Sequence, residues 1–470
     1  MLKLPTSSHL ELQSSQKTVN PSLTAFNTAV GTESANCFDS HCADQAVRFF
    51  LLQKRTYQLL SVFFRFFMLT MTDKVSSTDE HARAQRIRQL LIELGPSFVK
   101  LGQFISCRKD LLPETLTKEL SLLEDNLSPM SYEEVASVIE LELGACPDKL
   151  FKNFSKEPIA AASIGQVHRA QLPNGSQVAV KVQRPNLAFS FYRDLGYLRL
   201  LARLFRAIGK LKNADFWVRV ADEFGRHVFA EMNYLEEGRN ADRLRKDFRL
   251  ETEIVIPRVH WKYTSKKVLT LEYSPGIKIS AIDKLSKAGI DTNKLANILV
   301  KFYAGQILKT GFFHADPHAG NLAAGTFGEL IVYDFGMMSE VKLSDKEALQ
   351  TILHALARKD SYGLYQGLFN LGIAKQKEMN AELKEIFDSL LTYFSGGELT
   401  DIDWQGIERQ LDNLIEGQFF YLPPNLTYLI KTVSSLEGLI RNLKPNYNFR
   451  RALQPSLQSW LVDLLNPARA

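Results

Sequence analysis

Two acidic residues and one amide near the middle of the chain have the types and spacing for metal-assisted phosphate chemistry. Asp316 and Asn321 lie in the segment His-Ala-Asp-Pro-His-Ala-Gly-Asn, and Asp334 begins an Asp-Phe-Gly triplet after Ile-Val-Tyr. Carboxylate and amide oxygens suit Mg²⁺, which takes one or two protein carboxylates and completes its shell with water and substrate phosphates. The pattern predicts phosphoryl-transfer chemistry, in which a protein mainly positions groups and neutralises charge.

An earlier lysine and a glutamate could complete such a site. Strand alternation in residues 178–182 places Lys181 on the face opposite the valines. A lysine carried inward by a buried hairpin needs a counter-charge. The phosphates of ATP and the carboxylate of Glu237, on a predicted helix, would supply it. In kinases an equivalent lysine holds the α- and β-phosphates and an equivalent glutamate orients it.

The order of these residues along the chain is that of a protein kinase. Asp316 and Asn321 have the Asp-x-x-x-x-Asn spacing of a kinase catalytic loop. There the Asp accepts the acceptor's proton and the Asn binds metal, while Asp334 would hold the bridging Mg²⁺. Asp-Phe-Gly alone is a common tripeptide, and Val-Ala-Val-Lys alone is an ordinary edge strand. All of them together, in order, predict a nucleotide-binding kinase-like fold.

A zinc site is the alternative interpretation of His314 and His318, which lie four residues apart beside an acidic residue. Two histidines at this spacing share one face only in a helix, and Pro317 between them favours a loop. We therefore expect His314 to brace the loop by hydrogen bonding and His318 to lie near the phosphates.

Composition narrows the class of protein. The chain has 470 residues, 45% hydrophobic content and a formal net charge of +5, which permits contact with an anionic membrane without requiring nucleic acid. Four cysteines without zinc spacing are expected to be free thiols of an intracellular protein. The N-terminus lacks the pattern of a secretory signal, and residues 1–45, rich in Ser, Thr and Asn, are predicted to be a disordered leader.

Residues 49–71 form an apolar segment interrupted by Lys54, Arg55 and Arg65, so a helix that crosses a membrane is not expected. On a helical projection, Arg48 and these three residues share one sector. Two interpretations stay open at this point. The helix could lie at a membrane interface, or it could dock on the protein's own core with its basic edge in water.

The remaining pattern predicts an α+β fold with two lobes. Residues 81–145 have helical periodicity broken at Gly95-Pro96, Pro113 and Pro129. Pro173-Asn174-Gly175 is the turn of a hairpin between strands 166–171 and 177–182. Residues 187–245 are predicted to be helical, and Tyr273-Ser274-Pro275-Gly276 to separate the lobes. We divide the chain into a leader (1–45), an N-terminal helical extension (46–150), a small β-rich N-lobe (151–275) and a helical C-lobe (276–470).

Three short motifs give the chain a family resemblance. They are Lys100-Leu101-Gly102-Gln103, the alanine-rich Ala160-Ala161-Ala162-Ser163, and the segment from His314 to Asn321. With these motifs the chain resembles the UbiB family of atypical kinases, also called aarF-domain-containing kinases. The resemblance covers residues 85–340 strongly and the C-terminal part more weakly. It implies a bilobal protein-kinase-like fold with an added N-terminal helical element.

The resemblance also implies roles for particular residues. Lys100 and Gln103 would be regulatory, because the family's Lys-x-Gly-Gln segment lies across the entrance for a peptide substrate, and Lys100 would pair with Glu231. The family motif that usually reads Glu-x-Asp is here Glu231-Met232-Asn233, which removes one carboxylate. Glu237 matches the partner of Lys181, with Glu236 as the fallback.

The nucleotide would contact the alanine-rich loop (Ala160, Ala161, Ala162 and Ser163), Lys181 and, at the break between the lobes, Glu272 and Tyr273. A glycine loop lays its N–H groups close to phosphates because it lacks Cβ atoms, and alanines stiffen it. The family is accordingly linked to weak or absent protein phosphorylation. After Gly336 this sequence continues through Met337-Met338-Ser339-Glu340 into a helix, with no long activation segment.

These implications lead to a specific functional expectation. The chain is expected to be a peripheral-membrane atypical kinase or ATPase that uses ATP (or ADP) and Mg²⁺ and supports isoprenoid-quinone or related prenyl-lipid metabolism. Its expected partners are membrane lipids or lipid quinone intermediates and a biosynthetic protein complex, and no nucleic acid. A pseudokinase scaffold and a Ser/Thr protein kinase are the alternatives.

Overall fold

The computed structural model describes residues 55–59, 61–62, 80–106, 112–123, 129–207, 214–341, 343–394 and 424–465. The predicted leader and most of the apolar segment 49–71 lie outside these ranges. So do three of the four cysteines, and the fourth, Cys146, is a free thiol.

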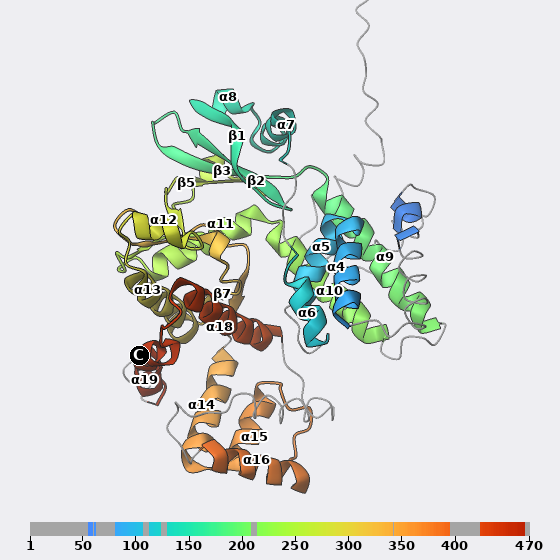
Figure 1. The fold of residues 1–470 in the computed structure, drawn as a ribbon, viewed down its shortest axis with the longest axis vertical. Helices are drawn as coiled ribbons and strands as arrows, with labels where there is room; N and C mark the ends of the chain where they lie inside the picture. The colour runs from blue at the N-terminus through green and yellow to red at the C-terminus, as the bar shows by residue number, and fades with distance from the viewer. Residues whose placement is uncertain are drawn as a thin grey trace, which may run out of the picture.

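A bundle of helices lies beside the two lobes (Figure 1). It contains α4 (Glu80–Leu94), α5 (Pro96–Ser106), α6 (Glu114–Leu120), α9 (Leu187–Ala207) and α10 (Ala214–Glu231). Gly95, at φ 93°, ends α4, and Pro96 begins α5, as the sequence predicts. The pair α9–α10 follows β3 in the chain, yet it packs against α5. Segments that precede and follow the first three strands of the small lobe in the sequence therefore build one helical bundle.

The described part of segment 49–71 docks on this bundle. Leu59 and Val62 are buried in one cluster with Leu94 and Phe98. Arg55 is only 14% exposed; its Nη2 lies 2.7 Å from Asp194 Oδ2 and donates to the Leu94 carbonyl at 2.6 Å. The expectation that Arg55 belongs to an exposed basic stripe is wrong, because a buried carboxylate from the distant helix α9 turns it inward.

The small lobe is a sheet with strand order β1-β2-β3-β5 (Figure 1). Its antiparallel strands are β1 (Asn153–Ala161), β2 (Gly165–Gln171), β3 (Gln177–Gln183) and β5 (Val268–Glu272). Val178, Val180 and Val182 are fully buried against α7 (Tyr132–Leu143), and the short helix α8 (Pro147–Leu150) precedes β1. This confirms the predicted hairpin and the alternation that leaves Lys181 on the opposite face.

Helix α11 (Tyr234–Asp247) lies between the small sheet and the larger lobe (Figure 1). Tyr234, Ala241 and Leu244 are fully buried in the main core. The expected single helical stretch 187–245 is thus three helices, and the turn at Met232-Asn233 separates α10 from α11. That turn directs Glu231 and Glu237, on successive helices, toward one region.

The larger lobe combines two small sheets with helices. One sheet has the order β4-β9-β8-β6, and the other pairs β7 with β10. The strands are β4 (Ile254–Val255), β6 (Ile277–Lys278), β7 (Phe312–His314), β8 (Leu322–Ala324), β9 (Leu330–Val332) and β10 (Met338–Glu340). The helices are α12 (Ile282–Lys287), α13 (Thr292–Ala304), α14 (Leu343–Arg358), α15 (Ser361–Asn370), α16 (Ala381–Phe394), α18 (Pro424–Leu443) and α19 (Phe449–Leu465).

Helix α13 is the buried centre of the larger lobe, with Leu295, Leu299 and Phe302 fully buried. It continues through a π-helical turn, Gly305–Thr310, into β7. Together the lobes form the bilobal α+β fold that the sequence predicts. Across the described ranges, no helix is both long enough and apolar enough to cross a bilayer.

Candidate functional site

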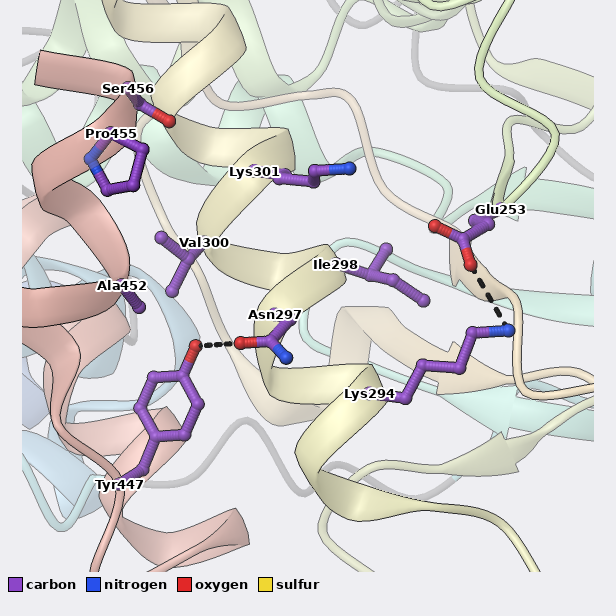
Figure 2. Close-up of a pocket in the computed structure, with 10 residues that line it drawn as sticks. All are labelled: Glu253, Lys294, Asn297, Ile298, Val300, Lys301, Tyr447, Ala452, Pro455 and Ser456. Carbon is purple, nitrogen blue, oxygen red and sulfur yellow. Dashed lines mark hydrogen bonds and ion pairs between the residues drawn. The ribbon is translucent and has the colours of Figure 1, made fainter. Parts of the chain in front are cut away.

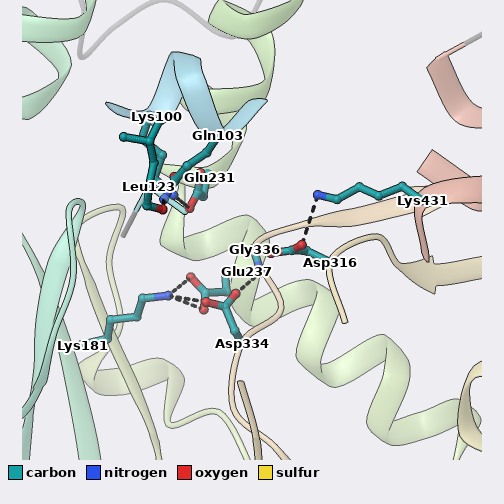
Figure 3. A network of polar contacts seen from close by, with 10 residues as sticks. All are labelled: Lys100, Gln103, Leu123, Lys181, Glu231, Glu237, Asp316, Asp334, Gly336 and Lys431. Atoms are coloured by element: carbon teal, nitrogen blue, oxygen red, sulfur yellow. Dashed lines mark hydrogen bonds and ion pairs between the residues drawn. The ribbon is translucent and has the colours of Figure 1, made fainter. Parts of the chain in front are cut away.

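Lys181 of β3 and Glu237 of α11 form a partly buried bidentate ion pair (Figure 3). Lys181 Nζ donates to Glu237 Oε1 at 2.7 Å and to Oε2 at 2.9 Å. The ammonium also lies over the Tyr234 ring, 5.0 Å from its centroid. Glu237 is only 1% exposed, whereas Glu236 is exposed and pairs with Arg239. The structure therefore brings together the pair predicted from sequence and excludes the fallback.

Asp334 completes this cluster. Its Oδ2 lies 3.5 Å from Lys181 Nζ, and its Oδ1 accepts a hydrogen bond from the Gly336 N–H at 2.8 Å. Burial alone would raise the pKa of Asp334, but the Lys181 ammonium and the Gly336 N–H outweigh it and bring the pKa to about 2. Burial raises the pKa of Glu237, although Lys181 opposes this shift. One ammonium thus faces two carboxylates, which leaves an excess of negative charge that suits a cation.

Asn321 ends the short 3₁₀ turn Ala319–Asn321, directly before β8. Its N–H donates to the His318 carbonyl at 3.0 Å, and its carbonyl accepts from the Tyr333 N–H at 2.9 Å. Because Tyr333 directly precedes Asp334, this backbone bond holds Asn321 and Asp334 on adjacent strand ends. The pairing of β8 with β9 therefore brings the backbones of the two predicted metal ligands close together, and the metal role of Asn321 stays a prediction.

Asp316 lies in the loop after β7 and is contacted from two sides. Its N–H donates to His314 Nδ1 at 3.1 Å, so the imidazole braces the loop as predicted. Burial lowers the pKa of His314, which keeps it neutral and able to accept this bond. On the other side, Lys431 Nζ of α18 lies 3.1 Å from Asp316 Oδ1 (Figure 3). Burial raises the pKa of Asp316, but the charge and hydrogen bond of Lys431 outweigh burial and hold the pKa below its ordinary value.

The predicted contact between Lys100 and Glu231 is present. Lys100 Nζ of α5 lies 3.0 Å from Glu231 Oε1 at the end of α10 (Figure 3). Gln103 Nε2 donates to the Leu123 carbonyl at 3.0 Å, inside the helical extension. A Cβ built at Gly336 would lie 3.6 Å from Glu231 Cγ and 3.8 Å from Glu237 Oε2. The Lys100 pair and the Lys181 cluster therefore meet at Gly336.

The alanine-rich loop joins β1 to β2. Ala160 and Ala161 end β1, and the Ala162 N–H donates to the Gly165 carbonyl at 2.8 Å. Arg184 Nε donates to the Ala162 carbonyl at 3.1 Å, and Ser163 is buried. The loop thus has a defined shape, and the N–H of Ala162 is already bonded within it.

The other predicted nucleotide contacts, Glu272 and Tyr273, lie where β5 leaves the small sheet. The Tyr273 N–H donates to the Gln177 carbonyl at 3.0 Å, and Arg169 lies over the Tyr273 ring at 4.7 Å from its centroid. The Glu272 N–H donates to the Arg258 carbonyl at 2.8 Å. These bonds fix the direction of the chain between the lobes, while the nucleotide role of both residues stays a prediction.

A separate pocket of about 360 Å³ lies between α13 and α19 (Figure 2). Its lining includes Lys294, Asn297, Lys301 and Tyr447, and contains none of the predicted site residues. Two of its polar groups are already paired: Lys294 with Glu253 at 3.1 Å, and Tyr447 Oη with Asn297 Oδ1 at 2.6 Å. The pocket is therefore distinct from the carboxylate cluster.

Sequence reasoning missed Lys431 and the role of Asn240. Asn240 Nδ2 donates to the Phe335 carbonyl at 3.0 Å and so links α11 to the Asp-Phe-Gly turn. Asn240 lies three residues after Glu237, close to one helical turn, and this spacing could have predicted that both side chains lie on the same face of the helix. Lys431 carries no such signal, because a lysine in an amphipathic helix usually faces water.

Comparisons with known proteins identify the family of the chain. Residues 122–368 match the model of the ABC1 atypical kinase-like domain. The Synechocystis protein sll1770 is 41% identical over 374 residues, which cover 79% of this chain and 64% of that protein. The Arabidopsis thaliana protein ACTIVITY OF BC1 COMPLEX KINASE 7, chloroplastic, is 38% identical over 403 residues, which cover 85% of this chain and 57% of that protein.

An aarF domain-containing protein kinase of Arabidopsis thaliana, also chloroplastic, is 33% identical over 410 residues, which cover 86% of this chain and 58% of that protein. The chain thus spans between 57% and 64% of the length of these three relatives. Among solved structures, Rv3197 of Mycobacterium tuberculosis in complex with erythromycin has a TM-score of 0.48 at 20% identity over 73% of this chain and 87% of its own. On the family match and the sequence relatives, this chain belongs to the ABC1 family of atypical kinase-like proteins, to which aarF-domain kinases are assigned.

Proposed function

We propose that the chain binds Mg-ATP between its two lobes and transfers the γ-phosphoryl group to an acceptor hydroxyl or to water. The observation that carries this proposal is the cluster of Lys181, Glu237 and Asp334, which adjoins Asn321. It combines a cation for phosphates with oxygen ligands for a divalent metal, and its excess negative charge favours such a metal.

The residues would serve either nucleotide and metal binding or proton transfer. Lys181, held by Glu237, would contact the phosphates, and Asp334 with Asn321 would hold Mg²⁺. Bound Mg²⁺ supplies charge neutralisation at the phosphate chain. In the transfer, the acceptor oxygen bonds to the γ-phosphorus, the bond to the leaving ADP oxygen breaks, and the acceptor's proton passes to Asp316. The lowered pKa of Asp316 keeps it ionised and able to accept that proton.

The acceptor class in this proposal is a prenyl-lipid or quinone intermediate at a membrane surface, or water. The lipid part of this proposal rests on the family alone, which the match to the ABC1 domain model identifies. The short path from Gly336 through β10 to α14 offers no long segment for docking a peptide, which argues against a protein kinase. Arg55 is paired with Asp194, so a membrane surface would have to attract other basic residues.

The test begins with purified chain in a thermal-shift titration with Mg-ATP, followed by phosphate release with and without anionic liposomes. Asp334→Asn should abolish Mg-dependent stabilisation, and Asp316→Ala should abolish phosphate release while nucleotide still binds. Unchanged Mg-nucleotide binding in Asp334→Asn would contradict the metal site. Nucleotide binding without phosphate release by the wild type would instead favour a pseudokinase scaffold for a biosynthetic complex.

A lipid profile of a deletion strain, rescued with wild type or Asp316→Ala, tests the quinone part of the proposal.

A further inference from the structure

Lys431 approaches the site from the side opposite Lys181 (Figure 3). Its Nζ lies 3.1 Å from Asp316 Oδ1, and its side chain is 17% exposed, against 38% for Asp316. A lysine on a solvent-facing helix would leave its ammonium in water. Here the ammonium is largely withdrawn from water and placed on one particular carboxylate, which requires that the helix itself be fixed.

Helix α18 is held against the loop that carries Asp316. Phe313 of β7 and Ala315 of the loop flank His314, and Tyr428 and Leu429, which lie three and two residues before Lys431, pack against them. The next residue, Thr432, is fully buried and donates its hydroxyl to the Tyr428 carbonyl at 2.7 Å. Leu436, Ile440 and Leu443 then anchor the rest of the helix in the main core. Packing on both sides of Lys431 thus determines where its side chain begins.

The charged groups around Asp316 indicate what the contact with Lys431 does. Lys181 is bound by Glu237 and Asp334, so its charge is already shared between two carboxylates. Asp316 would face the anionic phosphates, which repel a carboxylate. Its neighbours along the chain are His314, which is neutral, and His318, whose Nδ1 accepts the Gly320 N–H. Tyr303 of α13 lies close enough for the charge of Asp316 to raise the pKa of its hydroxyl. Lys431 is the lysine that the structure places directly on Asp316.

We infer that Lys431 is a positioning residue for Asp316, which holds the carboxylate in place from α18 so that it can accept the acceptor's proton. This inference rests on the proposed phosphoryl transfer and names a residue outside the kinase motifs. It also makes the C-terminal helix part of the site. Displacement of α18 would leave Asp316 without its cation, although every motif residue would still be in place.

The kinetic test compares Lys431→Met with Lys431→Arg in the full chain, with phosphate release from Mg-ATP as the assay. We expect Lys431→Met to lower kcat by about tenfold or more while KM for ATP stays within about twofold, since proton-transfer groups contribute at least this much. Lys431→Arg should recover most of kcat because it restores a cation. Arg441→Met, which removes an exposed pair with Glu437 on the same helix, is the matched control and should leave kcat unchanged.

Three outcomes of this assay would overturn the inference. One is an unchanged kcat in Lys431→Met. Another is an equal loss of kcat in Lys431→Met and Arg441→Met, because the effect would then come from helix stability. A loss of kcat that Lys431→Arg does not recover at all also contradicts a role for the charge.

A measurement independent of turnover separates this inference from the proposed function. Lys431→Met, Asp316→Asn and the double variant form a thermodynamic cycle read by Tm. We expect the double variant to lose less Tm than the sum of the single losses, because the two side chains form one interaction. Additive losses would overturn the inference. If the wild type binds Mg-ATP without releasing phosphate, the proposed turnover fails, and this cycle alone decides whether Lys431 positions Asp316.

Discussion

Lys100 Nζ lies 3.0 Å from Glu231 Oε1, and this pair joins the helical extension to the Asp-Phe-Gly turn. Glu231 Cγ lies 3.6 Å from where a Cβ at Gly336 would be, while Gly336 donates its N–H to Asp334. Lys100 also lowers the pKa of Asp334, by less than Lys181 and the Gly336 N–H do, whereas burial raises it. A change in the position of α5 would therefore change the pKa of the proposed metal ligand Asp334.

The first prediction concerns this charge coupling. Lys100→Met removes a cation near Asp334, so the site becomes more negative and should bind Mg²⁺ more tightly at saturating ATP. We expect a gain of a few-fold, which corresponds to less than about 1.4 kcal/mol. Glu231→Gln should weaken Mg²⁺ binding, and the double variant should lie close to wild type. The measurement is a Mg²⁺ titration followed by thermal shift.

The matched control for this prediction is Lys118→Met. Lys118 forms an exposed pair with Glu114 on α6 and lies in the same helical extension. Its removal should leave the Mg²⁺ titration unchanged. Equal shifts in Lys100→Met and Lys118→Met would mean that overall charge, and not the contact with Glu231, controls the metal site.

The second prediction separates stability from binding at the Lys181–Glu237 pair. Lys181→Met leaves the carboxylate of Glu237 buried without its ammonium, which should cost about 3 kcal/mol of unfolding free energy. Adding Glu237→Gln removes the unpaired charge and should recover most of that loss. Both proteins should fail to bind Mg-ATP. Urea unfolding measures the first effect and nucleotide-dependent thermal shift the second, and a double variant as unstable as the single one would contradict the argument.

The sequence predicted those parts of the site that depend on local pattern. Lys181 follows from strand alternation, Asn321 from a fixed spacing to Asp316, and Glu237 from its place on a helix. The structure pairs Lys181 with Glu237 and bonds the backbone of Asn321 to the residue before Asp334. Lys431 and Arg55 could not be predicted in this way. Their partners lie 115 and 139 positions away in sequence (431 − 316 and 194 − 55), and only the packing of α18 and α9 brings them close.

The same distinction holds for the fold. Gly95, Pro96 and Pro113 mark helix ends by their own backbone preferences, so these boundaries were predictable. The arrangement in which α9 and α10 join α4–α6 depends on which apolar faces meet. Helical periodicity shows that such a face exists, but it does not identify the helix against which that face packs.

The third prediction concerns the entry to β2. A Cβ at Gly165 would collide with the Val182 carbonyl oxygen and lie 2.6 Å from Tyr234 Oη. Because one of these atoms is backbone in the central strand β3, Gly165→Ala should destabilise the chain by about 1–3 kcal/mol. Gly438→Ala is the control, since that glycine is in α18 with no atom within 4 Å of the added Cβ. It should gain about 0.5–1 kcal/mol. Denaturant unfolding compares the two, and equal effects would contradict the steric argument.

The last prediction concerns pH and the small lobe. His168 of β2 is fully buried, and its Nδ1 lies 2.8 Å from the Ser155 carbonyl, which can only accept, so Nδ1 carries the proton. Its Nε2 lies 2.8 Å from Gln166 Nε2 and must therefore accept. A second ring proton would break this bond. Burial accordingly lowers the pKa of His168 below its ordinary value.

Because the folded-state pKa of His168 is depressed, the unfolded chain binds the proton more readily. The contribution of His168 to stability is complete above the unfolded pKa of about 6.5 and is lost as pH falls toward the folded value, by at most about 1.4 kcal/mol per pH unit. His168→Gln removes this titration, while the buried His314 and the half-buried His260 titrate in both proteins. Between pH 7.5 and pH 5.5 the Tm of the wild type should therefore fall further than that of the variant, and parallel pH profiles would show that His168 is not held neutral by its burial.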